Sequence, residues 1–132
     1  MKLITRDTDY AIRAISYIAS IKDRMVSARE LVEALEIPRP FLRKILQRLN
    51  QAGLLKSYKG QGGGFSLEVS PQRISLMRLI NVFQGPFRLN ECFFKKKPCP
   101  EAKRCRLRSR IERIEKFLIR ELKAIDMGCL LR

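Results

Sequence analysis

The sequence contains no histidine, the residue that most often acts as a general base at neutral pH and as a neutral metal ligand. Its absence excludes Ser/His and Cys/His catalytic dyads. Long apolar runs are also missing, because no stretch approaches the roughly 18 apolar residues that span a bilayer. The first residues turn polar at once, without the apolar centre of a signal peptide. We therefore expect a cytoplasmic protein that is not an enzyme and does not enter a membrane.

Acidic residues are scarce. The 132-residue chain has 13 Asp and Glu against 28 Lys and Arg, which gives a formal net charge of +15. Such a field attracts polyanions. Double-stranded nucleic acid is the first partner to consider, and an anionic membrane surface is the weaker alternative. Hydrophobic residues make up 45% of the chain, enough for one compact domain with an appendage.

Apolar residues at helical spacing predict a first helix over residues 5–21, with Thr5 as its cap. A second helix begins at the capping box formed by Ser27 and Glu30. It ends before Pro38, because proline disfavours helical geometry at the preceding residue.

A third helix is predicted over residues 39–51. Pro40 suits its first turn, and Gly53 suits the position after its end. Its apolar stripe consists of Leu42, Ile45, Leu46 and Leu49. Two short helices joined by a tight turn, the second strongly basic, are typical of a helix-turn-helix motif.

Two strand-like runs, residues 54–58 and 65–69, surround a glycine-rich tip and predict a β-hairpin. No Gly-Lys-Ser/Thr follows the glycines, which argues against a nucleotide-binding P-loop. A further short helix over residues 76–83, capped by Ser75, completes the element order of a winged helix.

The remainder of the chain divides into a loop and a long helix. Residues 84–105 hold three prolines, three cysteines and no helical period, as in a long functional loop. A helix follows over residues 106–125, and a near-heptad seam predicts that it packs on a partner helix. The seam consists of Leu107, Ile111, Ile114, Leu118, Leu122 and Ile125. We predict a mainly α fold: a winged helix-turn-helix domain with a small β-hairpin wing (1–83), a cysteine loop (84–105), and a dimerisation helix and tail (106–132).

The exposed face of the third helix is the candidate DNA-reading surface. Residues near the start of such a helix reach base edges in the major groove. We assign guanine contacts to Arg39, Arg43 and Lys44, and a thymine methyl contact to Phe41. Any one of these charges alone would be interpreted as a solvated surface residue, but their clustering favours DNA. Phosphate contacts are assigned to Arg48 and Lys56, and a minor-groove contact to the wing with Lys59, Gly62 and Gly63.

Cys92, Cys99 and Cys105 have the spacing C-x6-C-x5-C. This spacing differs from the closely paired ligands of zinc fingers and from bacterial ferredoxin motifs. The loop is long enough to surround one metal cluster, and its many lysines and arginines would partly offset the negative charge of thiolates that hold a cluster. A thiol redox switch, a zinc site and reduced bystander cysteines are the alternatives. Cys129 lies beyond a helix that carries it roughly 35 Å away, so we expect a bystander and not a ligand from the same chain. Cys129 of the partner subunit stays an alternative ligand.

These residues together resemble the IscR/NsrR/CymR family (the Rrf2 family) of bacterial winged-helix regulators. The resemblance rests on Met1–Leu3 with Asp9–Arg13, on Ile37–Leu49, on the wing Lys59–Gly64 and on the three cysteines. It implies a homodimer that is paired by the C-terminal helices and binds an imperfect palindrome in promoters. It also implies a [2Fe-2S] or [4Fe-4S] cluster on the three matching cysteines, whose state, or nitric oxide, changes the affinity for DNA.

The fourth cluster ligand differs within this family. IscR-type members use a histidine three residues after the last cysteine, where this chain has Arg108. NsrR-type members use an aspartate of the partner subunit's first helix, and Asp9 matches that position, with Asp7 as the nearby alternative. The resemblance thus predicts a DNA-binding regulator that is gated by an iron–sulfur cluster.

Overall fold

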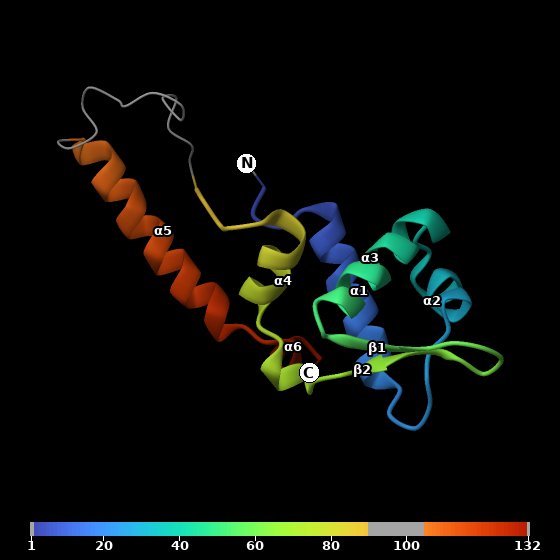
Figure 1. Cartoon of the computed structure of the whole chain (residues 1–132). Coiled ribbons are helices and arrows are strands. Elements are labelled where there is room, and N and C mark those ends of the chain that lie inside the picture. Colours follow the sequence, from blue (N-terminus) through green and yellow to red (C-terminus); the bar gives the residue numbers. More distant parts are fainter. Residues whose placement is uncertain (1, 90–104, 132) are drawn as a thin grey trace.

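A computed structural model describes residues 2–89 and 105–131. Helices α1, α2 and α3 form one body with the β-hairpin, and α4 lies between this body and the long helix α5 (Figure 1). The tip of the hairpin and the start of α5 point to opposite sides of the molecule. The elements are α1 Arg6–Ser20, α2 Ala28–Leu35, α3 Arg39–Gln51, β1 Leu55–Tyr58, β2 Gly64–Leu67, the short 3-10 helix η1 Pro71–Arg73, α4 Leu76–Gln84, α5 Arg106–Ala124 and α6 Met127–Leu130. None of the described helices is long and apolar enough to cross a membrane.

The expected helix starts are confirmed by their caps. The side chains of Thr5, Ser27 and Ser75 each accept a hydrogen bond from a backbone N–H three residues later. Each bond satisfies a donor that has no partner inside the helix. The capping box of α2 is half formed, because the carboxylate of Glu30 accepts its side-chain hydrogen bonds from Tyr17 and Arg24 instead.

The main core lies between α1, α3 and the hairpin. Alanines at positions 11 and 14 of α1 are fully buried and permit close helix packing. The predicted stripe of α3 is confirmed as buried: Leu42, Ile45, Leu46 and Leu49. This orientation turns the basic side of α3 outward.

The wing is a two-stranded antiparallel sheet in which Leu55 pairs with Leu67 and Tyr58 with Gly64. A β-bridge that the sequence did not predict connects this sheet to Val26, just before the start of α2. The Val26 N–H donates to the Phe65 carbonyl at 2.9 Å, and the Phe65 N–H donates to the Val26 carbonyl at 2.8 Å. A Cβ atom on Gly64 would lie 2.5 Å from the Val26 carbonyl oxygen, so the close approach of the two chains requires glycine.

Helix α4 connects the main core to the C-terminal helices. Its Leu76, Met77 and Ile80 pack against Leu122 of α5 in a second apolar cluster. The expected tail forms the short helix α6, whose Met127 is fully buried in the main core. The Leu76 N–H donates to the Ile125 carbonyl at 2.8 Å, so the C-terminal end of α5 is fixed to the start of α4.

A charged network joins the end of α1 to the start of α2. The Tyr17 hydroxyl donates to Glu30 Oε2 at 2.6 Å, and Arg24 donates to both carboxylate oxygens at 2.6 and 2.9 Å. These hydrogen bonds, from Arg24 first and from Tyr17 second, lower the pKa of Glu30 from 4.5 to about 2, because they stabilise the ionised carboxylate.

Gly64→Ala tests the bridge between the wing and α2. We expect a loss of about 3 kcal/mol of unfolding free energy, because the added methyl displaces a backbone carbonyl. Gly62→Ala is the matched control: Gly62 has φ +75° and open space around a Cβ, so we expect a loss of about 1 kcal/mol. Urea unfolding measures both losses. Equal losses for the two variants would contradict the steric role of Gly64.

Glu30→Gln tests the charged network. The pKa of Glu30 is lower in the folded chain, so its stabilisation is present above the unfolded value and is lost as the pH falls towards about 2. The difference in unfolding free energy between the wild type and Glu30→Gln should therefore be constant above about pH 5 and shrink between about pH 5 and pH 2. Glu33→Gln, which removes an exposed ion pair of the same helix, is the control. A difference that does not change with pH would refute the assignment.

Candidate nucleic-acid interface and cysteine site

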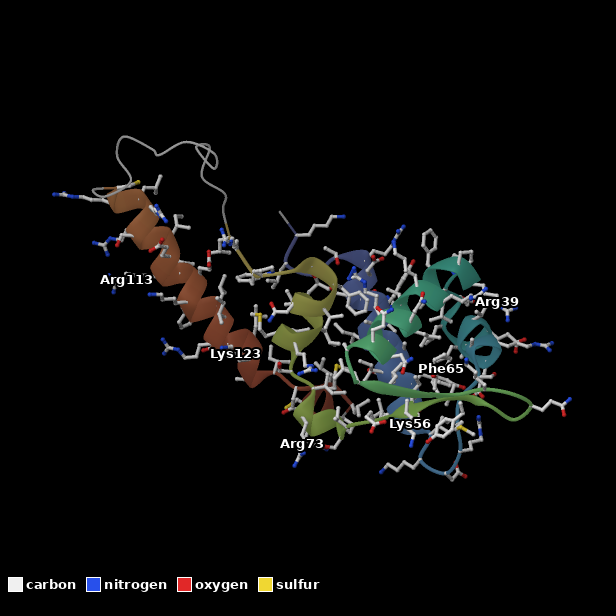
Figure 2. All side chains as sticks on the ribbon, viewed as in Figure 1. Arg39, Lys56, Phe65, Arg73, Arg113 and Lys123 are labelled. Carbon is white, nitrogen blue, oxygen red and sulfur yellow. The ribbon has the colours of Figure 1, made fainter. Side chains whose placement is uncertain are left out.

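The exposed side of α3 has a middle and two flanks. At about 100° per residue, Lys44 and Gln47 occupy the middle of the side opposite the buried stripe. Arg39 and Arg43 lie on one flank, and Figure 2 shows Arg39 at the end of α3 that adjoins α2. Phe41 and Arg48 lie on the other flank, which faces α1 and α4.

The three predicted base-reading residues keep their donors available. Arg39, Arg43 and Lys44 are all exposed. Within residues 2–89 and 105–131, none of them has an ion pair or a side-chain hydrogen bond. Unpaired cations on one helix face can donate to acceptors of a partner molecule without first breaking an internal contact.

Arg48 has an internal partner. Its Nη1 donates to the Val82 carbonyl of α4 at 2.9 Å. Arg78 of α4 makes the reciprocal contact, since its Nη2 donates to the Ala52 carbonyl at the end of α3, also at 2.9 Å. This pair of bonds, which we call the arginine clamp, fixes α3, the candidate recognition helix, to α4. Sequence reasoning missed the clamp because both acceptors are backbone carbonyls, which leave no pattern in the side chains.

The other cations assigned to DNA lie on the hairpin. Lys56 Nζ is 5.4 Å from the centroid of the Tyr58 ring on the same strand, and both side chains are exposed. Lys59 is exposed at the tip of the wing. A Cβ atom on Gly63 would lie 2.3 Å from the Tyr58 carbonyl oxygen, so Gly63 is required by the turn itself. The backbone at position 62 has φ +75°, a left-handed conformation that glycine adopts without strain.

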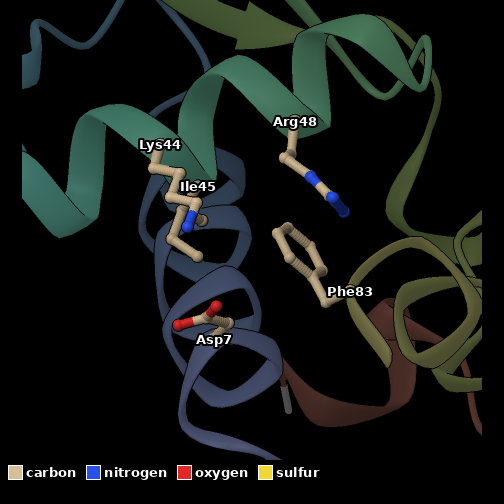
Figure 3. A pocket seen from close by; sticks show the side chains of 5 residues that line it. All are labelled: Asp7, Lys44, Ile45, Arg48 and Phe83. Atoms are coloured by element: carbon tan, nitrogen blue, oxygen red, sulfur yellow. The ribbon is translucent and has the colours of Figure 1, made fainter. Parts of the chain in front are cut away.

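A small pocket opens beside the recognition helix, where α1, α3 and α4 meet (Figure 3). Its volume is about 240 Å³. The lining residues are Asp7, Lys44, Ile45, Arg48 and Phe83. The carboxylate of Asp7 thus lies on the α1 side of a pocket whose α3 side carries two cations.

The structure describes one of the three predicted cluster cysteines. Cys105 caps α5, and its Sγ accepts a hydrogen bond from the Arg108 N–H at 3.3 Å. Its thiol is free and half-exposed. Cys92 and Cys99 lie outside the described residues. Within the described ranges, no three His, Cys, Asp or Glu side chains come together as a metal site.

The other residues considered as cluster ligands are Cys129 and Asp9, and within one copy of the chain they belong to other elements than Cys105. Cys129 is exposed on α6, beyond the opposite end of α5, as its sequence position predicted. Asp9 lies in the first turns of α1, where its Oδ2 is 3.0 Å from Nε of Arg13. The Asp9 side chain is 45% exposed, so a second molecule can reach it.

Comparison with known proteins identifies relatives of one kind. The profile of the Rrf2 family, described as "Iron-dependent Transcriptional regulator", matches residues 4–132. The chain is 36% identical over 92 residues to a helix-turn-helix-type transcriptional regulator of Aquifex aeolicus; the match covers 70% of this chain and 64% of that relative, less than two thirds of its length. It is 30% identical over 107 residues to the transcriptional repressor NsrR of Streptomyces coelicolor, covering 80% of this chain and 72% of the relative.

A solved structure confirms the predicted winged-helix fold. CymR, the global cysteine regulator of Bacillus subtilis, superposes with a TM-score of 0.78. The two chains are 23% identical, and the match covers 99% of this chain and 97% of CymR.

Proposed function

The chain belongs to the Rrf2 family of transcriptional regulators, and on this premise we propose that it is a homodimer whose binding to promoter DNA is gated by an iron–sulfur cluster. The observation that carries the proposal is the exposed side of α3. Among the residues that the structure describes, Arg39, Arg43 and Lys44 have no ion-pair partner, while the helix itself is held in place by its buried stripe and the arginine clamp.

DNA binding follows from this arrangement. An α-helix fits the major groove, where Arg and Lys donate to the O6 and N7 atoms of guanine. Arg39, Arg43 and Lys44 are the proposed base readers, and Phe41 is the proposed contact to a thymine methyl group. Contacts to phosphates are assigned to Lys56 and to Arg48, whose guanidinium nitrogens other than Nη1 take no part in the arginine clamp. Lys59 enters the adjacent minor groove from the wing, on the turn that Gly62 and Gly63 form.

Pairing of two copies is proposed for α5. The C-terminal part of the predicted seam is used inside the chain, because Leu122 packs on α4. Further towards the start of the helix, Leu107, Ile114 and Phe117 are 68%, 52% and 54% exposed. An apolar helix face of this kind is covered by a partner, and a second copy supplies the same face about a two-fold axis. Such a dimer presents two recognition helices to a palindrome.

The three cysteines are the proposed cluster ligands. Cys105 fits this part, since its thiol is free, half-exposed and placed at the start of α5, next to the cysteine loop. Cys92 and Cys99 complete the set, and Asp9 of the partner subunit is the proposed fourth ligand because Arg108 occupies the position of the histidine. A bound cluster would supply a group whose loss or modification signals iron, redox state or nitric oxide.

A cluster-free thiol switch is the second candidate function. The fold likeness to a cysteine regulator supports it, and Cys105 can equally form a disulfide or bind zinc. The two functions share the DNA-binding dimer and differ in what the cysteine loop holds.

Base reading is tested on duplexes selected by the protein from a random pool. Arg43→Ala and Lys44→Ala should each lower affinity by about 1–3 kcal/mol and relax the preference at one base pair. Lys56→Ala should weaken all duplexes alike and reduce the salt dependence. Arg29→Ala, which removes an exposed cation of α2, is the control. Fluorescence anisotropy measures each affinity. A wild-type chain that does not bind duplex DNA at low salt would contradict the proposal.

The cluster is tested by anaerobic purification with iron, sulfide and zinc analysis. We expect a coloured protein with more than one iron per chain, about 2 or 4 for the two cluster types. Cys105→Ala should lose iron and colour, and Cys129→Ala, the matched control, should keep both. A colourless protein with a reversible disulfide or bound zinc would instead establish the thiol switch or the zinc site.

A further inference from the structure

The first turn of α1 brings an arginine onto the recognition helix. The guanidinium carbon of Arg6 lies 4.5 Å from the centroid of the Phe41 ring and 5.9 Å from that of Tyr10. A cation over an aromatic face at these distances is attracted by the electrons of the ring. The start of α1 therefore carries a positive charge to the N-terminal turn of α3.

Arg6 is positioned without being neutralised. Within the described residues its one ion pair is with Asp7, whose Oδ1 is 4.0 Å from Nε, the outer limit for such a pair. The side chain of Arg6 is 61% exposed. A guanidinium that stacks on a ring keeps its N–H donors in its own plane, where they remain able to bind an anion.

The backbone beneath Arg6 is held by Gln84 at the end of α4. Gln84 Oε1 accepts from the Thr5 N–H at 3.0 Å and from the Thr8 hydroxyl at 2.7 Å. Gln84 Nε2 donates to the Leu3 carbonyl at 3.2 Å. Gln84 thus binds residues that precede Arg6 in the sequence and one that follows it. The turn that carries the guanidinium is therefore anchored to the end of α4.

Phe41 lies at the edge of the DNA-reading surface. It is 40% exposed on the flank of α3 that faces α1, whereas Arg39 and Arg43 occupy the opposite flank. When a helix lies in the major groove, side chains at the outer edge of its exposed side can reach the phosphates that border the groove. Arg6 extends the basic surface beyond the α1 flank, towards one of these phosphate rows.

We propose that Arg6 binds a phosphate of the DNA backbone, and that Phe41 is the positioning residue that holds its guanidinium in place. The proposal rests on the DNA-binding function proposed above and enlarges that interface to include α1. A phosphodiester carries no sequence information, so Arg6 contributes affinity and not base preference. Phe41 then acts through Arg6, and this role replaces the thymine methyl contact that was proposed for it above.

Arg6→Ala tests the phosphate contact, by anisotropy titrations of the full chain over a range of salt concentrations. The affinity should fall by about 1.5-fold to 5-fold per bound copy, equally for the selected duplex and for random duplex. The slope of log affinity against log salt should become shallower by about 0.9 per bound copy. Arg6→Lys should keep the slope of the wild type, and the control Arg29→Ala should change neither quantity.

Phe41→Leu tests the positioning role, because it keeps apolar volume and removes the ring. It should lower the affinity for the selected duplex and for random duplex by the same factor as Arg6→Ala. The double variant should bind no more weakly than Arg6→Ala alone. Thermal unfolding of each variant separates loss of binding from loss of folding.

Two results would overturn the inference while DNA binding by the wild type stands. In the first, Arg6→Ala binds DNA with the affinity and salt slope of the wild type. In the second, Phe41→Leu alters the preference at one base pair, and its effect adds to that of Arg6→Ala, as for a direct thymine contact. A wild-type chain that binds no DNA would overturn the proposed function, and this inference with it.

Discussion

The position of the recognition helix depends on how α4 packs between α3 and α5. On one side α4 buries Leu79 in the main core, and on the other it packs against Leu122 of α5. The arginine clamp adds two hydrogen bonds between α3 and α4, one at each end of the contact. Because well-packed interfaces resist gradual deformation, a movement of α4 together with α5 has to be accommodated by α3.

Under the proposed function, this arrangement would connect the cysteine loop to the DNA-binding surface. The loop follows the end of α4 in the sequence and ends at Cys105, the cap of α5. Under the proposed function, a ligand held by these residues would act between the end of α4 and the start of α5. Gln84, at that same end of α4, also holds the first turn of α1 and with it Arg6. The strength of such coupling is limited to the difference in ligand affinity between the two arrangements.

Local signals in the sequence were sufficient for α1 to α5, but not for the short helices η1 and α6 or for the contacts between helices. Thr5, Ser27 and Ser75 cap helices as predicted, because a capping bond spans three residues. The bridge from Val26 to Phe65 and the bond from Arg48 to Val82 join residues more than thirty positions apart. Such contacts depend on how the helices pack and leave no periodic pattern.

The candidate site shows the same division. The free cations of α3 were predictable, because the apolar stripe fixes which side of a helix faces outward. The internal bond of Arg48 and the stacking of Arg6 on Phe41 were not, since they depend on where α1 and α4 lie. The assignment of Cys105 rests on sequence spacing and family resemblance, and its place as a helix cap came from the structure.

The central claim is that two recognition helices act as a pair that α5 holds together. Sedimentation of the chain with a palindromic duplex, for the wild type and for Ile114→Glu, tests it most directly. The account predicts two wild-type copies on one duplex and a dimer without DNA, and it predicts that a charge in the exposed seam gives a monomer that binds much more weakly. A wild-type chain that sediments as a monomer and binds the duplex as tightly as Ile114→Glu would contradict it.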